Sequence, residues 1–284
     1  MHSFLKPYDD ECARLAVDRV RTFDALERKY FQLRGYNIFE MSDIIAIEKA
    51  LNIKGHNSFS PCRTCEIKGV RNVTGGEKIY YVPLTWPNGR SWNPEDLPMR
   101  SPDKLAEVVE KLADCSTAKG REDLTKFHGI KGLPALRRVG SLCYGRSAPW
   151  EFMHLIIEGN IQNLVKHWSG RYKGLDTGTG NYEIPDATWE IIWQETAAAV
   201  QHLPADFVRV LGDNPAYYTA EAWCFWFVYL APILLQGRFP DPKYYKHACQ
   251  FSDIIKCCLR FTSTHTQIHD LRHDIINWVR KYEE

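Results

Sequence analysis

The sequence predicts an α+β protein that is mostly α, in which a partial α/β fragment is followed by an all-α domain. Residues 31–41 place aromatic and β-branched side chains among polar ones, a pattern typical of a strand. In residues 150–168, apolar side chains recur at steps of three and four, which predicts an amphipathic helix. Helical spacing then covers most of the remaining chain, in residues 185–203, 219–235, 244–261 and 264–282.

The first elements lead to a carboxylate. Residues 5–30 carry apolar side chains at loosely helical intervals, so we expect a helix there before the strand. Ser42 is the expected N-cap of a short apolar helix over residues 44–51. Asp43 then lies where the helix dipole favours a negative charge.

The middle of the chain is expected to be less regular. Residues 80–84 resemble a short strand, and the proline-rich stretch 85–101 is a loop. A Ser-Pro pair at Ser101 opens a helix over residues 103–118. Residues 121–145 are expected to form short pieces interrupted by glycines.

These elements suggest three parts. Residues 1–84 form the partial α/β core with its cysteine pair, residues 85–145 a loop-rich connection with helices, and residues 146–284 the all-α domain. An apolar run at residues 222–235 is shorter than the roughly 20 residues of a membrane span, and Pro232 interrupts it. We therefore expect a buried helix there and no membrane partner.

Composition restricts the function further. The net charge is +1, so no overall field favours nucleic acid, and DNA contact would need a local patch such as Lys131, Arg137 and Arg138. The nine cysteines follow no recognisable leader peptide, which indicates free thiols in a reducing, intracellular compartment. Phosphate-binding glycine loops and the hydrolase nucleophile motif are missing from the sequence, so no nucleotide partner is expected.

Two motifs suggest metal chemistry. Asp43 can serve as a carboxylate ligand in a two-Mg²⁺ phosphoryl-transfer site, or simply cap a helix. Cys62 and Cys65 have the spacing of half a zinc site, although two ordinary thiols in a turn would look the same. A thioredoxin-like redox role is disfavoured, because no strand leads directly into the pair and no helix clearly begins there.

Two sets of side chains share helix faces. His265, His269 and His273 are spaced four residues apart, which can bring two imidazoles to one metal or leave them on a solvated face. Glu151 and His154 also share a face, where they could support a carboxylate site or form an ion pair.

Four blocks resemble the CACTA (En/Spm-type) DNA transposases, in the form common in fungal genomes. The blocks are KGHNSFSPCRTCEIKGV, PWEFMHLIIEGNIQNLVKHW, YYTAEAWCFWFVYLAPILL and YYKHACQFSDIIKCCLRF. They follow the family's order, and the resemblance covers roughly residues 20 to 284. It implies a cut-and-paste transposase that acts on transposon ends in the nucleus, with an RNase H-like catalytic domain that uses Mg²⁺ and three acidic residues.

The resemblance assigns roles to particular residues. Asp43 matches the second acid, although the family's flanking Gly and Pro are absent. Cys62 and Cys65 match the family's CxxC, and Glu151 to His154 match its Asp-x-x-His motif, with Glu in place of Asp. The later helices match the α-helical insertion domain between the second and third acids. The first acid, the third acid and an HxxxH zinc pair are expected to lie outside this chain.

Three hypotheses follow. The first is a truncated transposase, derived from a transposon and inactive alone. The second is a helical module that binds DNA ends, or binds an intact transposase and modulates it. The third is an unrelated helical zinc protein that uses Cys62, Cys65 and two of His56, His265 and His269.

Overall fold

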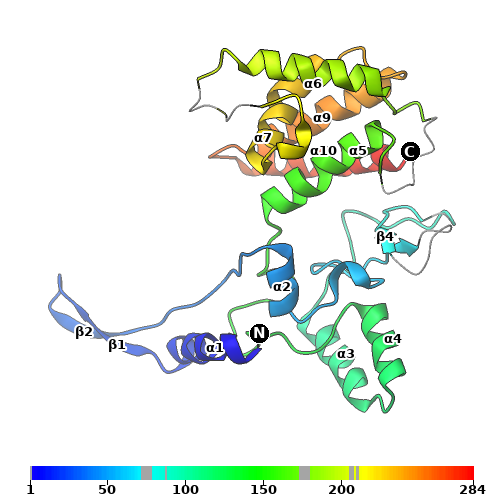
Figure 1. Ribbon diagram of the computed structural model, residues 1–284. Helices are drawn as coiled ribbons and strands as arrows, with labels where there is room; N and C mark the ends of the chain where they lie inside the picture. Colours follow the sequence, from blue (N-terminus) through cyan, green and yellow to red (C-terminus); the bar gives the residue numbers. More distant parts are fainter. Residues whose placement is uncertain (1, 72–78, 87, 173–179, 205–207, 209–210) are drawn as a thin grey trace. The chain divides into compact units, whose positions relative to one another are not determined.

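The structure is a computed structural model that describes residues 2–71, 79–86, 88–172, 180–204, 208 and 211–284 (Figure 1). It is a mostly helical α+β protein, as the sequence predicts. The chain divides into two compact units, Met1–Glu151 and Phe152–Glu284. Each unit is described separately.

The first unit begins with a helix and a β-hairpin instead of the single helix expected over residues 5–30. Helix α1 (His2–Val17) ends before Arg19, whose φ of 68° is not helical. Strands β1 (Val20–Asp24) and β2 (Lys29–Leu33) then pair antiparallel. The β-branched and aromatic side chains of both strands favour this pairing over a helix.

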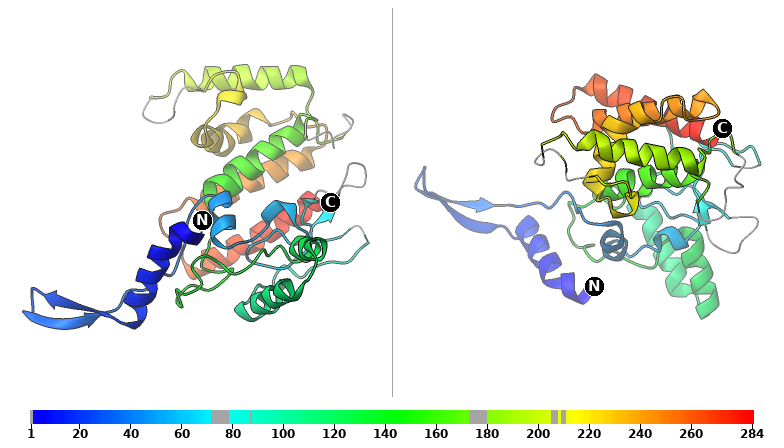
Figure 2. Two further views of the ribbon diagram at one scale, coloured as in Figure 1. Left: turned by 60° about the horizontal axis from the view of Figure 1, so that its bottom comes forward. Right: turned by 45° about the horizontal axis from the view of Figure 1, so that its top comes forward.

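The hairpin projects away from the other elements of its unit (Figures 1 and 2). The side chain of Asp24 closes its turn by accepting the N–H groups of Leu26 and Glu27 at 2.9 and 3.0 Å. The strand predicted over residues 31–41 is wrong beyond Leu33, because residues 34–43 have no regular structure. The described residues include no third strand that pairs with β1 or β2.

The rest of the first unit is built from short elements around a small core. In chain order these are α2 (Ile44–Ala50), η1 (Gly55–Asn57), β3 (Val70–Arg71), β4 (Ile79–Tyr81), α3 (Pro102–Asp114) and α4 (Ala118–His128). Ser101 caps α3 as predicted. Helix α4 was not predicted: Thr117 caps its start, and Gly129, with φ of 74°, ends it in the left-handed conformation.

The core of the first unit joins α3 to the segments around it. Its buried members are Ile53, Leu105, Val108, Leu112, Ile130 and Tyr144. Three of them, Leu105, Val108 and Leu112, form the buried face of α3. A bridge between Ile53 and Ile130 fixes the chain after α2 beside the end of α4.

The elements of the second unit are all helical within its described residues, as predicted. Its elements are η2 (Met153–Ile161), α5 (Gln162–Trp168), α6 (Asp186–Val200), η3 (Pro215–Tyr217), α7 (Ala220–Phe225), η4 (Trp226–Leu230), α8 (Ala231–Leu234), α9 (Pro242–Cys258) and α10 (His265–Glu283). The segments η2 and η4 are π-helical turns within longer helices. The side chain of Asn160 donates to the carbonyl of Leu155 at 2.9 Å, within the wider turn of η2.

A buried tryptophan lies at the centre of the second unit. Trp226 is fully buried, and its indole N–H donates to Thr196 Oγ1 at 3.0 Å. Thr196 in turn donates to the carbonyl of Ile192 at 2.8 Å, so the buried indole N–H of Trp226 and the hydroxyl of Thr196 both have hydrogen-bond partners. The apolar run at residues 222–235 is thus a core helix, and none of the described helices is long and apolar enough to cross a membrane.

Helices α9 and α10 are joined by a reciprocal contact. The His247 ring stacks on the Trp278 ring, with centroids 4.5 Å apart and planes at 8°. Nε2 of His247 lies 3.0 Å from the Trp278 carbonyl, and the Trp278 indole donates to the His247 carbonyl at 3.1 Å. Burial lowers the pKa of His247, although the hydrogen bond to Trp278 opposes this.

We expect the stability of the chain to fall as the pH drops below about 6.5, the ordinary histidine pKa. The pKa of His247 is lower in the folded state, so the unfolded chain binds more protons in that range. Urea unfolding across pH measures the effect, and His247→Gln, which keeps a donor for Trp278, should flatten the profile. An unchanged profile in this variant would contradict the assignment.

Candidate functional site

The cysteine pair lies in a loop between η1 and β3 that folds tightly around one sulfur atom. Sγ of Cys62 accepts the backbone N–H groups of Thr64 and Cys65, each at 3.3 Å. The Cys65 thiol also donates to Cys62, and Cys65 is buried. Three donors therefore converge on Cys62, which is the arrangement that stabilises a thiolate.

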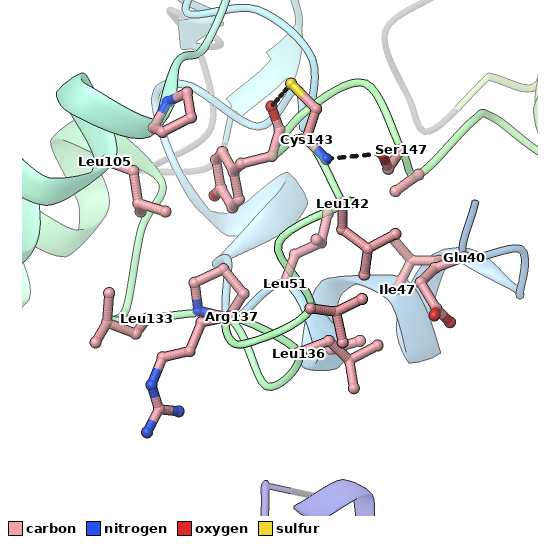
Figure 3. Close-up of a pocket in the computed structure, with 16 residues that line it drawn as sticks. Glu40, Ile47, Leu51, Leu105, Leu133, Leu136, Arg137, Leu142, Cys143 and Ser147 are labelled. Atoms are coloured by element: carbon pink, nitrogen blue, oxygen red, sulfur yellow. Dashed lines mark hydrogen bonds between the residues drawn. The ribbon is translucent and has the colours of Figure 1, made fainter. Parts of the chain in front are cut away.

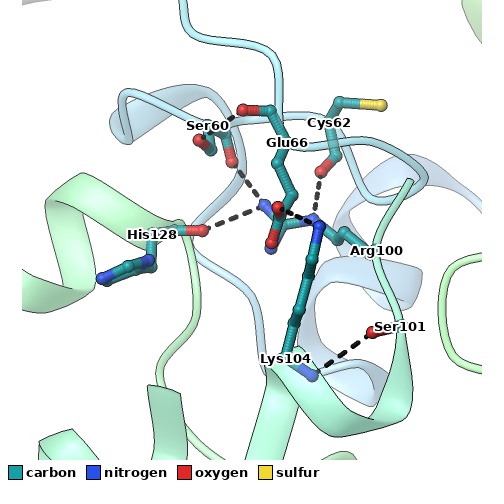
Figure 4. Close-up of polar contacts among 7 residues, drawn as sticks. All are labelled: Ser60, Cys62, Glu66, Arg100, Ser101, Lys104 and His128. Atoms are coloured by element: carbon teal, nitrogen blue, oxygen red, sulfur yellow. Dashed lines mark hydrogen bonds and ion pairs between the residues drawn. The ribbon is translucent and has the colours of Figure 1, made fainter. Parts of the chain in front are cut away.

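Arg100 fixes this loop to the rest of the unit (Figure 4). Its guanidinium donates to the carbonyls of Cys62 at 2.8 Å, Ser60 at 2.9 Å and His128 at 3.0 Å. The backbone N–H of Arg100 also donates to the carbonyl of Thr64 at 2.9 Å. Arg100 thereby joins the cysteine loop, the start of α3 and the end of α4.

A second buried guanidinium follows Cys62 directly. Arg63 is only 2% exposed; it donates to the Pro149 carbonyl at 2.6 Å and lies 4.0 Å from the centroid of the Trp150 ring. Its Nε has no hydrogen-bond partner in the described part of the chain. Burial lowers the pKa of Arg63, while the charge of Cys62 opposes that change.

The two thiols differ in protonation. The hydrogen bond from Cys65 is the largest cause that lowers the pKa of Cys62 to about 6, helped by the backbone N–H groups and by Arg100 against the effect of burial. The same hydrogen bond, together with burial, raises the pKa of Cys65. The contacts around the pair therefore favour ionisation of Cys62 and disfavour ionisation of Cys65.

This loop can hold a soft or borderline metal ion with two sulfur ligands. Backbone N–H groups aimed at a sulfur stabilise its ionised form, which is the form that binds metal. A structural zinc site needs four ligands. Within the described residues, no three His, Cys, Asp or Glu side chains gather where one metal could bind them all. Among the described residues, the cysteine loop can therefore offer two sulfur ligands, those of Cys62 and Cys65.

Asp43 is a helix cap in this structure. Its Oδ1 accepts the N–H of Ala46 at 2.6 Å, so the N-cap of α2 is Asp43 and the prediction of Ser42 is wrong. Asp43 lies directly before α2, and its carboxylate oxygen is a stronger hydrogen-bond acceptor than the hydroxyl of Ser42. Among the described residues, Asp43 shares no group of three His, Cys, Asp or Glu side chains that could hold a metal ion.

Glu151 and His154 fall on either side of the division between the two units. Glu151 ends the first unit, and His154 lies in η2 of the second. Nε2 of His154 is 3.9 Å from Oε2 of Glu158, one turn later.

The other predicted binding residues are dispersed. Nε2 of His56 lies 3.1 Å from the side-chain amide of its neighbour Asn57. In the proposed basic patch, Arg138 forms ion pairs with Asp9 and Asp10, which neutralise part of its charge.

Arg137 borders an apolar cavity of about 170 Å³ that sequence reasoning missed (Figure 3). Its guanidinium points away from the aliphatic side chains, which include Ile47, Leu51 and Leu105. The lining comes from separate stretches of residues 40–51, 102–105 and 133–148, so no local pattern could have revealed it. Arg63 and Arg100 were missed for the same reason.

Searches against protein-family models, curated proteins and solved structures gave no match to this chain.

We expect Cys62 to react with iodoacetamide at an unusually low pH, because the thiolate is the reactive form. The rate of alkylation at Cys62, plotted against pH, should have its midpoint near the pKa of about 6. Peptide mass spectrometry measures this rate at Cys62 separately from the other cysteines. Cys65→Ala removes the donated hydrogen bond and should raise the midpoint, whereas Cys65→Ser, which keeps a donor, should change it less. Equal midpoints in the two variants would contradict the role of Cys65.

Proposed function

We propose that this chain derives from a cut-and-paste DNA transposase and acts by binding, with no strand-cleavage activity of its own. The cysteine loop supports this most directly. One of the four blocks that carry the resemblance, residues 54–70, folds around Sγ of Cys62, whose N–H donors favour the ionised form that binds metal. The RNase H-like fold and the nuclear location belong to this proposal and rest on the resemblance alone.

Zinc is the cofactor that the cysteine loop fits. Cys62 and Cys65 supply two sulfur ligands, and the N–H donors and Arg100 favour the ionised form of Cys62. A bound zinc ion would stabilise the loop structurally and supply no chemistry to a substrate. It would also block alkylation of both thiols, so the alkylation assay tests for it directly.

Magnesium does not fit the described residues. Two-metal phosphoryl transfer needs several carboxylates around the ions. Asp43 uses an oxygen to cap α2 and shares no three-ligand cluster with other described side chains. The Mg²⁺ chemistry of the intact family is therefore not part of what we propose for this chain alone.

We expect the purified chain to leave duplex DNA intact in the presence of Mg²⁺. The substrate is a duplex that carries the inverted repeats of the element, and nicked strands are resolved on a denaturing gel. Asp43→Asn is the matched variant, because Asn caps a helix as well as Asp but lacks the charge. Mg²⁺-dependent nicking that Asp43→Asn abolishes would overturn the proposal.

A second candidate function is binding to an intact transposase, and the hairpin favours it. Val20, Phe31 and Leu33 lie on one face of the hairpin and are each about 40% exposed. A two-stranded hairpin alone is only marginally stable in water, and open strand edges readily pair with another strand. A strand of the larger protein would cover both the edge and the apolar face.

We expect Phe31→Asp to reduce co-purification of the chain with an intact transposase, because it places a charge on the apolar face. Gln32→Asp is the matched control, since it adds the same charge to the opposite face of the same strand. Quantitative pull-down measures both variants. Equal capture of the two would argue against the hairpin as the contact.

A further inference from the structure

Two histidines in the first half of α10 point their ring nitrogens at each other. His269 and His273 are one turn apart, and their Nε2 atoms are separated by 3.2 Å. The ring centroids are 4.4 Å apart with planes at 68°. The His269 side chain is 68% exposed, so the space in front of this pair opens to solvent.

The spacing of these nitrogens matches the requirements of a shared metal ion. Two imidazole nitrogens bound to one tetrahedral Zn²⁺ at 2.0–2.1 Å lie about 3.3 Å apart. We propose that His269 and His273 chelate a divalent transition metal through their Nε2 atoms. The ions that suit imidazole are Zn²⁺, Ni²⁺ and Cu²⁺.

The helix holds the pair in place before any metal binds. Thr264 and Gln267 form a capping box, in which each side chain bonds the backbone N–H of the other, at 3.2 and 2.9 Å. Farther along, Trp278 fixes α10 to α9. Once one imidazole binds the ion, the second is already within reach, which raises the affinity without added ordering cost.

The carboxylate of Asp270 lies near the ring nitrogen of His269 that would not bind the metal. Oδ1 of Asp270 is 3.9 Å from Nδ1 of His269, the nitrogen that keeps its proton when Nε2 binds metal. Negative charge at that position makes the ligating nitrogen more basic. Two protein ligands leave the remaining coordination positions to water or to a group from a bound molecule.

The competing account is a hydrogen bond between two neutral imidazoles, which has the same nitrogen separation. His265 provides a way to distinguish the two. It lies one turn before His269 in the same row, and the described contacts include no hydrogen bond between these two residues. Loss of His265 should therefore have no effect on a site made by His269 and His273.

Nickel binding to the full chain tests the proposal. The chain is purified without a histidine tag, in a Cys62→Ser/Cys65→Ser background that removes the sulfur ligands, and Ni²⁺ is titrated by calorimetry at about pH 7.5. We expect one ion per chain. His269→Gln and His273→Gln should each weaken binding about 100-fold, the usual gain from a second tethered contact, and His265→Gln should leave it unchanged.

Two outcomes would overturn the proposal. One is a chain that takes up no Ni²⁺, and the other is a set of three histidine variants with the same affinity. Circular dichroism of each variant checks that the helices remain folded. Because these positions are on the exposed side of α10, we expect the helical signal to stay the same.

Discussion

The first unit depends on one buried cation. Arg100 is 5% exposed, and its guanidinium donates hydrogen bonds to three backbone carbonyls. Two of these carbonyls belong to the cysteine loop and one to the end of α4. An unpaired buried charge is costly, so carbonyl dipoles and the Cys62 thiolate must offset it. The same contact that fixes the loop therefore favours ionisation of Cys62. Arg100 thus contributes both to the structure of this loop and to the ionisation of Cys62, although the hydrogen bond from Cys65 lowers the pKa of Cys62 more.

Close packing around Arg100 adds a second constraint. Gly129 ends α4 with φ of 74°, and a Cβ there would lie 2.2 Å from the Ser60 carbonyl, one of the groups that Arg100 binds. Only glycine satisfies both the backbone conformation and this close approach. The end of α4 and the cysteine loop are thus matched to each other, although α4 itself gave a weak signal in the sequence.

The sequence predicted the second unit better than the first for a physical reason. Helices such as α9 and α10 bury one apolar face, so their periodicity is visible in a single stretch of chain. Strand β1 and the start of β2 were mistaken for part of a helix, because these strands are short, exposed and held by each other, whereas the end of β2 was predicted as strand. For the candidate site, spacing identified Cys62 and Cys65. It could not identify Arg100, whose guanidinium donates hydrogen bonds to backbone carbonyls, which need no particular side chain as partner.

The number of ligands at each proposed site determines how this chain could bind metal. In the two metal sites that we propose, the cysteine loop and the histidine pair would each supply two ligands, sulfur in the first unit and nitrogen in the second. Two ligands hold an ion less firmly than the four of a structural site, so occupancy follows the free metal concentration and any ligand that fills the open positions. The fraction of such sites that holds a metal ion therefore changes with the concentrations of metal and of other ligands in solution. That behaviour is compatible with the binding role proposed above, whereas a metal-dependent catalyst needs its ions held in fixed geometry before the substrate arrives.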